Sequence, residues 1–127
     1  MDMVWIGVGA AVGANIRYYV GQWVAVWLGV AFPNGTLIVN LSGSFLIGVI
    51  ATLLGERLLV DPHWRLLLVV GLLGGYTTFS SFSFEVVTLL QADRWFAATA
   101  YVLASVVLGL VACLLGIFLV RSTGGGV

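Results

Sequence analysis

Four long apolar stretches separated by short polar turns dominate the chain. They cover about Val4–Ala31, Thr36–Leu54, Arg65–Leu90 and Trp95–Val120. Each is close to or above the length of helix, about 20 residues, that crosses the hydrocarbon core of a bilayer. Four crossings place both ends of the chain on one side of the membrane. The pattern predicts an all-α integral membrane protein, with one four-helix domain over residues 1–127.

The third stretch is interrupted by a polar segment near its middle. Gly74 and Gly75 each weaken a helix by roughly 1 kcal/mol relative to alanine. Hydroxyls that compete for backbone hydrogen bonds follow at Thr77, Thr78, Ser80, Ser81 and Ser83. Irregular backbone at membrane depth persists only where protein buries it or water reaches it. We therefore expect a helix broken between Gly74 and Ser83 that lines a polar path.

Composition agrees with a membrane protein and excludes several partners. Hydrophobic residues make up 61% and charged residues 8% of the chain, whereas soluble domains carry about 25% charged residues. A net charge of +0 without lysine argues against nucleic acid as a partner. The single cysteine, Cys113, allows no intrachain disulfide, and we expect a small buried hydrophobe. The only histidine, His63, is expected to anchor a loop at the membrane interface rather than to bind a metal.

The first stretch contains a packing pattern and one charged residue. Gly9 with Gly13, and Ala10 with Ala14, repeat at the small-xxx-small spacing that brings membrane helices close together. Arg17 lies near the middle, where a guanidinium costs about 3 kcal/mol on insertion scales. Two interpretations of Arg17 stay open. Its side chain reaches toward one interface, or it faces a water-filled mouth where it attracts anions.

Polar residues also share faces of the second and fourth stretches. Asn40 and Ser44 are one helical turn apart, and Tyr101, Ser105 and Gly109 follow the same spacing. Such residues serve either as hydrogen-bonded bridges between helices or as ligands for a permeating species, and the spacing alone does not decide between them.

The broken stretch also predicts an assembly of more than one copy. In a lone subunit its polar backbone would face lipid, at a prohibitive hydrogen-bond cost. A homo-oligomer is therefore expected, and a two-fold dimer is the commonest form. Arg57, Arg65 and Arg121 fall on the side of the termini and Arg94 on the other. This bias is weak, so both insertion orientations stay open.

Two motifs point to a family. Gly35–Asn40 (GTLIVN) and Gly74–Glu85 (GGYTTFSSFSFE) resemble the two signatures of the Fluc fluoride channels, also called CrcB, and Gly13–Tyr18 resembles a looser third. The resemblance covers the whole chain, including the number of spans and the placement of the break. It implies an antiparallel, dual-topology homodimer with two pores in the plasma (inner) membrane of a prokaryote, which passively exports cytoplasmic fluoride.

The resemblance also implies a set of site residues. The pore would be lined by Asn40, Phe79, Phe82, Thr78, Ser81, Tyr101 and Ser105. Glu85 would lie near one end of the path, with Arg17 in a vestibule. Backbone carbonyls of Gly74 and Thr77 from both subunits would hold a structural sodium ion. The chain departs from the family at Ser81, where threonine is usual, and at Gly109, which has no hydroxyl where the polar track would continue.

Physical chemistry is consistent with these roles. Fluoride is small and strongly hydrated, so N–H and O–H donors must replace its water. Phenylalanine rings carry positive edges that can face an anion, although aromatic residues three apart are more often plain core.

Three other functions compete with a passive channel. A proton-coupled antiporter or dual-topology exporter would need an ionisable acid in its binding span, and Glu85 is the only candidate. Another competing function is that of a membrane assembly subunit that transports nothing. An enzyme is not expected, because no histidine or carboxylate pair is placed to activate the hydroxyls.

Overall fold

The structure is a computed structural model that describes residues 1–57 and 60–123, and every regular element in them is a helix. In chain order, with η for π-helical segments, these are α1 (Asp2–Leu28), α2 (Asn34–Thr52), η1 (Leu53–Arg57), α3 (His63–Arg65), η2 (Leu66–Leu73), α4 (Gly74–Tyr76), α5 (Phe79–Gln91), α6 (Trp95–Leu103), η3 (Ala104–Leu108) and α7 (Gly109–Ser122). They join into four long rods: α1, α2–η1, α3–α5 and α6–α7. The expected helical architecture is confirmed.

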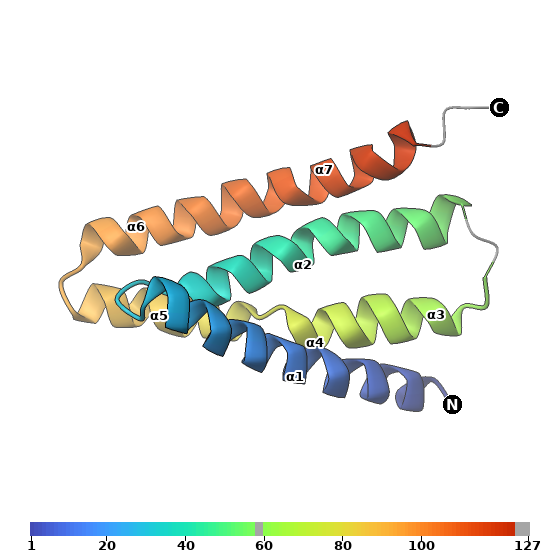
Figure 1. The fold of residues 1–127 in the computed structure, drawn as a ribbon, viewed down its shortest axis with the longest axis horizontal. Helices are drawn as coiled ribbons and strands as arrows, with labels where there is room; N and C mark the ends of the chain where they lie inside the picture. The colour runs from blue at the N-terminus through green and yellow to red at the C-terminus, as the bar shows by residue number, and fades with distance from the viewer. Residues whose placement is uncertain (58–59, 124–127) are drawn as a thin grey trace.

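The four rods run back and forth along one long axis (Figure 1). The described ends of the chain, Met1 and Thr123, lie at the same end of the bundle, as four crossings predict. α1 packs against η2 and α4, while α2 packs against α7. Gly29, with φ 75°, ends α1, so the first turn lies a few residues before the expected Phe32–Gly35.

Three of the rods are long and apolar enough to span a membrane on length and composition alone. Within the described residues these are Asn34–Glu56, His63–Gln91 and Trp95–Ser122. The rod α1 is comparable in length, with 27 residues, but is not among these three spans; Asn15, Arg17 and Gln22 interrupt its apolar sequence. The protein is thus a multi-pass membrane protein with a fourth long helix beside its three most apolar ones.

The third rod is broken, but over a shorter length than the sequence predicts. Gly74 keeps helical angles (φ −63°, ψ −36°), and α5 is regular from Phe79 onward. Only Thr77 (φ −82°, ψ 158°) and Thr78 (φ −150°, ψ 119°) are extended. The expectation of a break reaching from Gly74 to Ser83 is therefore wrong in extent. β-Branched residues favour extended backbone, and here the two threonines take it.

Glycines set the two tightest helix contacts. A Cβ atom at Gly9 or Gly13 would collide with the backbone of η2, which confirms the small-residue packing predicted for the first stretch. Gly75 meets the backbone of Ala10 in the same way, so it serves close packing rather than helix breaking. Gly48 and Gly116 do the same for the contact between α2 and α7.

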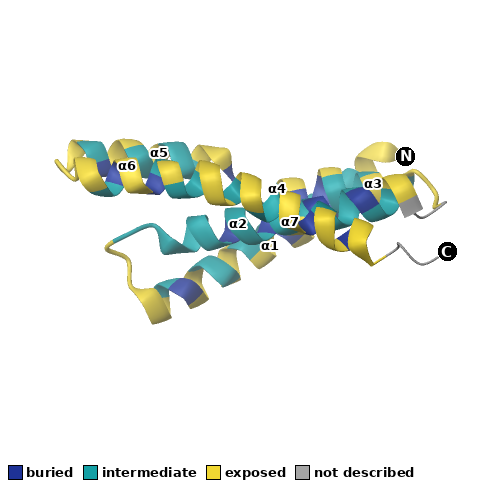
Figure 2. Cartoon of the chain, turned by 90° about the horizontal axis from the view of Figure 1, so that it is seen from above, coloured by how far each residue is buried: buried dark blue, intermediate teal, exposed yellow. Residues whose placement is uncertain are grey.

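Most large apolar side chains remain exposed in a single subunit. Figure 2 shows buried residues only as scattered patches between the rods. Phe96 is 90% exposed and Val26 81% exposed, whereas Tyr101 is completely buried. Such an outer surface suits lipid or a second protein and does not suit water.

Ionic contacts gather at the end of the bundle that holds the termini. Arg121 at the end of α7 pairs with Glu56 on η1. In the third rod's entry turn, His63 contacts Asp61 and stacks near Trp5 of α1, with ring centroids 5.4 Å apart. The backbone N–H and ring of His63 lower the pKa of Asp61. His63 therefore ties the entry of the third rod to α1, and its role as an anchor at the membrane interface stays a prediction; the side chain of Arg57 lies outside the described residues.

Candidate functional site at the helix break

Asn40 on α2 holds the break with both ends of its amide. Its Oδ1 accepts from the Thr78 N–H at 2.8 Å, and its Nδ2 donates to the Thr78 carbonyl at 2.9 Å. The side chain thus satisfies both backbone groups of a residue that has left the helix. Of the two interpretations, the structure makes Asn40 a bridge between helices. Because an amide nitrogen carries two hydrogens, a second donor remains for another acceptor.

Thr78 begins the second half of the broken helix and collects hydroxyls around it. Its Oγ1 accepts from the Ser81 N–H at 3.2 Å, which is an N-cap of α5. The same oxygen lies 3.1 Å from the Ser81 hydroxyl and 3.3 Å from that of Ser80. The N-terminus of α5, with its unpaired N–H groups, therefore opens onto a cluster of three hydroxyls.

Glu85 lies one helical turn beyond this cluster and is held from two sides. Its Oε1 accepts from the Thr36 hydroxyl of α2, and its Oε2 accepts from the Tyr101 hydroxyl of α6, both at 2.7 Å. Charge-assisted hydrogen bonds of this length are among the stronger contacts in proteins. They join three of the four rods at one carboxylate. Thr36 lies 49 residues from Glu85 in the chain, so no helical spacing connects the two.

Two of the three phenylalanines of the motif, Phe79 and Phe82, lie on one side of α5 and lead toward Tyr101. The rings of Phe79 and Phe82 are 5.6 Å apart between centroids. Phe82 meets the Tyr101 ring edge-on at 5.1 Å. Phe79 is 78% exposed at the surface of the subunit. Phe82 is half-buried and packs against the core around Tyr101 and Leu89, whereas Phe79 faces outward beside the break.

Arg17 reaches inward to the break. Its Nη1 donates to the Thr77 carbonyl at 3.4 Å. The interpretation of a side chain that extends to an interface is therefore wrong, because an acceptor freed by the break holds the guanidinium in the bundle. Arg17 also borders a cavity of about 230 Å³ whose lining includes Thr36, Thr78, Ser81 and Glu85. A cation, a carboxylate and several hydroxyls thus share one small polar space.

The break frees two backbone carbonyls on the first half of the helix. The Thr78 N–H, which would bond to the Gly74 carbonyl in a continuous helix, bonds to Asn40 instead. The Thr77 carbonyl accepts only the long contact from Arg17 within the described residues. Two oxygens without side-chain charge can help to hold a cation, as unwound carbonyls do in membrane transporters. In the described residues no group of three histidine, cysteine or acidic side chains forms a metal site.

Ser105 stands apart from this network. Its Oγ is buried and has no hydrogen-bond partner within the described part of the chain. Of the predicted site residues, the structure therefore brings all but Ser105 together around the break. It adds Thr36 and a Ser42–Tyr76 hydroxyl contact of 2.8 Å, which no spacing rule could have revealed.

Known proteins resemble this chain along nearly its full length. A family model described as "CrcB-like protein, Camphor Resistance (CrcB)" matches residues 4–117. A protein of Roseiflexus sp. is 52% identical over 116 residues, covering 91% of this chain and 94% of its own length. One from Chloroflexus aurantiacus is 48% identical over 120 residues (94% and 95%), and one from Rhizobium meliloti is 44% identical over 117 (92% and 94%). All three relatives carry the name fluoride-specific ion channel FluC.

Proposed function

The chain belongs to the CrcB-like family, and on this premise we propose that it is a channel that conducts fluoride passively across a membrane. The observation that carries the proposal is the break at Thr77–Thr78, where donors from three rods, Arg17, Asn40 and Tyr101, meet the break or the helix α5 that follows it. In a prokaryotic cell such a channel would lie in the plasma (inner) membrane and let cytoplasmic fluoride leave.

The ion would move along the hydroxyls and amide that surround the break. The second N–H of Asn40 and the Ser81 hydroxyl, which Thr78 holds in place by donating to it, are donors that can replace the water of a fluoride ion. Further along the last rod, Ser105 offers an unpartnered hydroxyl one turn after Tyr101, whose hydroxyl donates to Glu85 in the structure. Donors held in place before the ion arrives cost little rearrangement when it binds.

Phenylalanine rings would line the part of the path that has no hydroxyl donors. An aromatic ring is positive at its edge, so Phe79 and Phe82 can present ring edges to an anion. The half-buried and exposed positions of these rings support a path that runs along the outer side of α5 rather than through the centre of one subunit.

Charged groups would act at the mouth of this path. Arg17 borders the polar cavity and would attract anions, while Glu85 would hold Thr36 and Tyr101 in place. Glu85 is also the acid on which a proton-coupled antiporter would depend. Because both of its oxygens already accept hydroxyl hydrogen bonds, Glu85 has a positioning role that suits a channel rather than a proton carrier.

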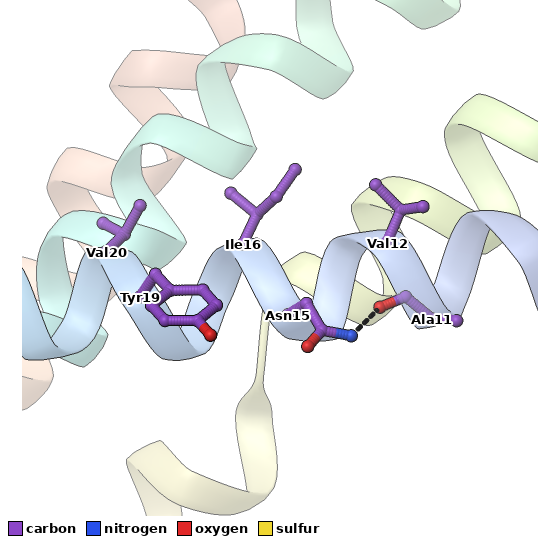
Figure 3. Close-up of a pocket in the computed structure, with 6 residues that line it drawn as sticks. All are labelled: Ala11, Val12, Asn15, Ile16, Tyr19 and Val20. Carbon is purple, nitrogen blue, oxygen red and sulfur yellow. Dashed lines mark hydrogen bonds between the residues drawn. The ribbon is translucent and has the colours of Figure 1, made fainter.

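A second copy of the chain would complete the path. Phe79 and Asn15 are exposed at membrane depth, and the close-up in Figure 3 shows Asn15 on an outer groove of α1, bonded only to its own helix at the Ala11 carbonyl, 2.8 Å away. Polar and aromatic groups at such places need a protein neighbour. An antiparallel, dual-topology homodimer would bury both and would form two equivalent pores.

The same dimer would place a sodium ion at its centre. The carbonyls of Gly74 and Thr77, freed by the break, would hold it together with the same carbonyls of the partner. When bound, the cation would supply fixed positive charge close to the anion path. Its role would be structural, because its ligands would be backbone carbonyls whose positions are fixed by the fold.

Purified protein in liposomes tests the function. Vesicles loaded with potassium fluoride and treated with valinomycin should release fluoride rapidly, measured with a fluoride electrode, while potassium chloride vesicles retain chloride. The paired change Phe79→Ile/Phe82→Ile should reduce the fluoride rate without dissolving the dimer. Equal release of the two halides would overturn selectivity, and no release from well-folded protein would favour an assembly subunit.

A further inference from the structure

The last rod lacks a hydroxyl one turn beyond Ser105, because that position is Gly109. We propose that Ser44 on α2 supplies the missing hydroxyl, so that the fluoride path crosses from the last rod to the second rod at this level. The inference rests on the proposed channel function and adds a residue to its path.

Ser44 and Gly109 face each other across the contact between α2 and α7. A Cβ atom built on Gly109 would lie 3.7 Å from the Ser44 Oγ, an ordinary van der Waals distance. The space beside Gly109 is therefore occupied by a hydroxyl from the neighbouring helix. Other glycines of this seam differ, because at Gly48 and Gly116 the added atom would collide with backbone.

The Ser44 hydroxyl is free to bind. Within the described part of the chain it makes no hydrogen bond, whereas its neighbour Ser42 bonds to the Ile38 carbonyl at 2.7 Å and contacts the Tyr76 hydroxyl. A half-buried serine on a membrane helix, as Ser44 is, normally donates a hydrogen bond to a backbone carbonyl of its own helix. A donor left unused is available to an ion that has lost its water.

Two further observations connect Ser44 to the path. Ser44 lies one turn from Asn40, and both line a cavity of about 340 Å³ that also touches Thr78 and Phe79. Ser105 holds the second unpartnered hydroxyl, which is buried one turn before Gly109. Ser105 and Ser44 thus offer consecutive free donors on facing helices, which is what a dehydrated anion would require.

Moving the hydroxyl between the two helices tests the proposal in fluoride-loaded liposomes. Ser44→Ala should slow fluoride release about tenfold, the effect of losing one hydrogen bond to a charged group. Adding Gly109→Ser to Ser44→Ala should restore most of the rate, because the new side chain fits in the space and returns the hydroxyl. Gly109→Ala in the same background adds the Cβ atom without the hydroxyl and should restore nothing.

The controls separate this inference from the channel function itself. Thr88→Ala removes a hydroxyl that already donates to the Phe84 carbonyl of its own helix and lies outside the proposed path, and it should keep the wild-type rate. If wild-type protein releases no fluoride, the proposed function fails. If wild-type protein conducts and Ser44→Ala conducts equally, or if Gly109→Ser fails to restore the rate or Gly109→Ala restores it as well, only the role of Ser44 is overturned.

Discussion

Two helix contacts in this protein are built in opposite ways. Where α2 meets α7, Gly48 and Gly116 bring the backbones together, and both helices are continuous there. Where α2 meets the third rod, side-chain hydrogen bonds cross the contact, and the helix opposite is broken. The first contact depends on shape, and the second depends on donors and acceptors.

The difference follows from how many backbone N–H and C=O groups each helix leaves unpaired. A continuous helix satisfies its own N–H and C=O groups, so its neighbours need only fit closely in lipid. A broken helix presents free groups that must be paired by side chains. The hydrogen bonds that Arg17, Thr36, Asn40 and Tyr101 make to other rods therefore meet the break or α5, and the Ser42–Tyr76 contact lies directly before the break. Polar chemistry collects where secondary structure stops.

Removing the amide at the polar contact should have the largest effect. Asn40→Ala leaves the Thr78 N–H and C=O unpaired, at about 1–3 kcal/mol for each group. We expect fluoride release near background and a free energy of unfolding, measured in detergent, that falls by several kcal/mol. Thr88→Ala is the control, because the Thr88 hydroxyl donates to the Phe84 carbonyl of its own helix and not to another rod. If Asn40→Ala were as stable as the wild type, the two Asn40–Thr78 hydrogen bonds would not be what holds the break.

Filling the apolar contact should have the next largest effect, and of a different kind. In Gly116→Val the new side chain would collide with the backbone of α2 at Phe45, so unfolding should become easier by about 1–3 kcal/mol. Fluoride-to-chloride selectivity should survive in the protein that still folds. Gly7→Val makes the same change where a Cβ meets nothing within 4 Å, and it should be tolerated. If Gly116→Val lost its selectivity while Gly7→Val kept it, the contact between α2 and α7 would have to shape the fluoride path.

Neutralising the carboxylate should weaken the polar contact without removing it. Glu85→Gln keeps an acceptor for one of the Thr36 and Tyr101 hydroxyls, so the expected cost is about 1 kcal/mol of stability. Fluoride release should slow but continue, because a channel needs no proton at this site. Complete loss of transport in a stable, dimeric variant would instead favour a proton-coupled carrier.

The smallest effect is expected at the aqueous end, which belongs to neither contact. Because His63 lowers the pKa of Asp61, the carboxylate stabilises the fold above its unfolded pKa, near 3.9, and that contribution is lost as pH falls through the lower folded value. Asp61→Asn should therefore lower the thermal midpoint slightly at pH 7 and not below pH 3, with unchanged fluoride release. A large loss of release would place Asp61 in the path.

Much of this architecture could be predicted because apolar length and small-residue spacing are read directly along the chain. The four rods and the close approach at Gly9 and Gly13 followed from those patterns. The extent of the break did not, because Gly74 and Gly75 suggest a break as strongly as they suggest close packing. The adjacent β-branched residues Thr77 and Thr78 were the better signal for where extended backbone begins.

The partners of the site residues could not be predicted in the same way. Helical spacing puts Asn40 and Ser44 on one face, but it does not say which helix that face meets. Arg17 and Thr36 depend on contacts with residues 60 and 49 positions away. Such contacts depend on how the rods are rotated about their axes relative to each other. That rotation cannot be predicted from the sequence of a single rod.

The two described ends of the chain emerge at the same end of the bundle (Figure 1). A fluorescent reporter attached before Met1 and another attached after the last rod would therefore sample the same compartment in every copy, whichever way that copy was inserted. A quencher added to one side of sealed vesicles should dim both reporters by equal fractions. That common fraction would give the share of chains facing each direction.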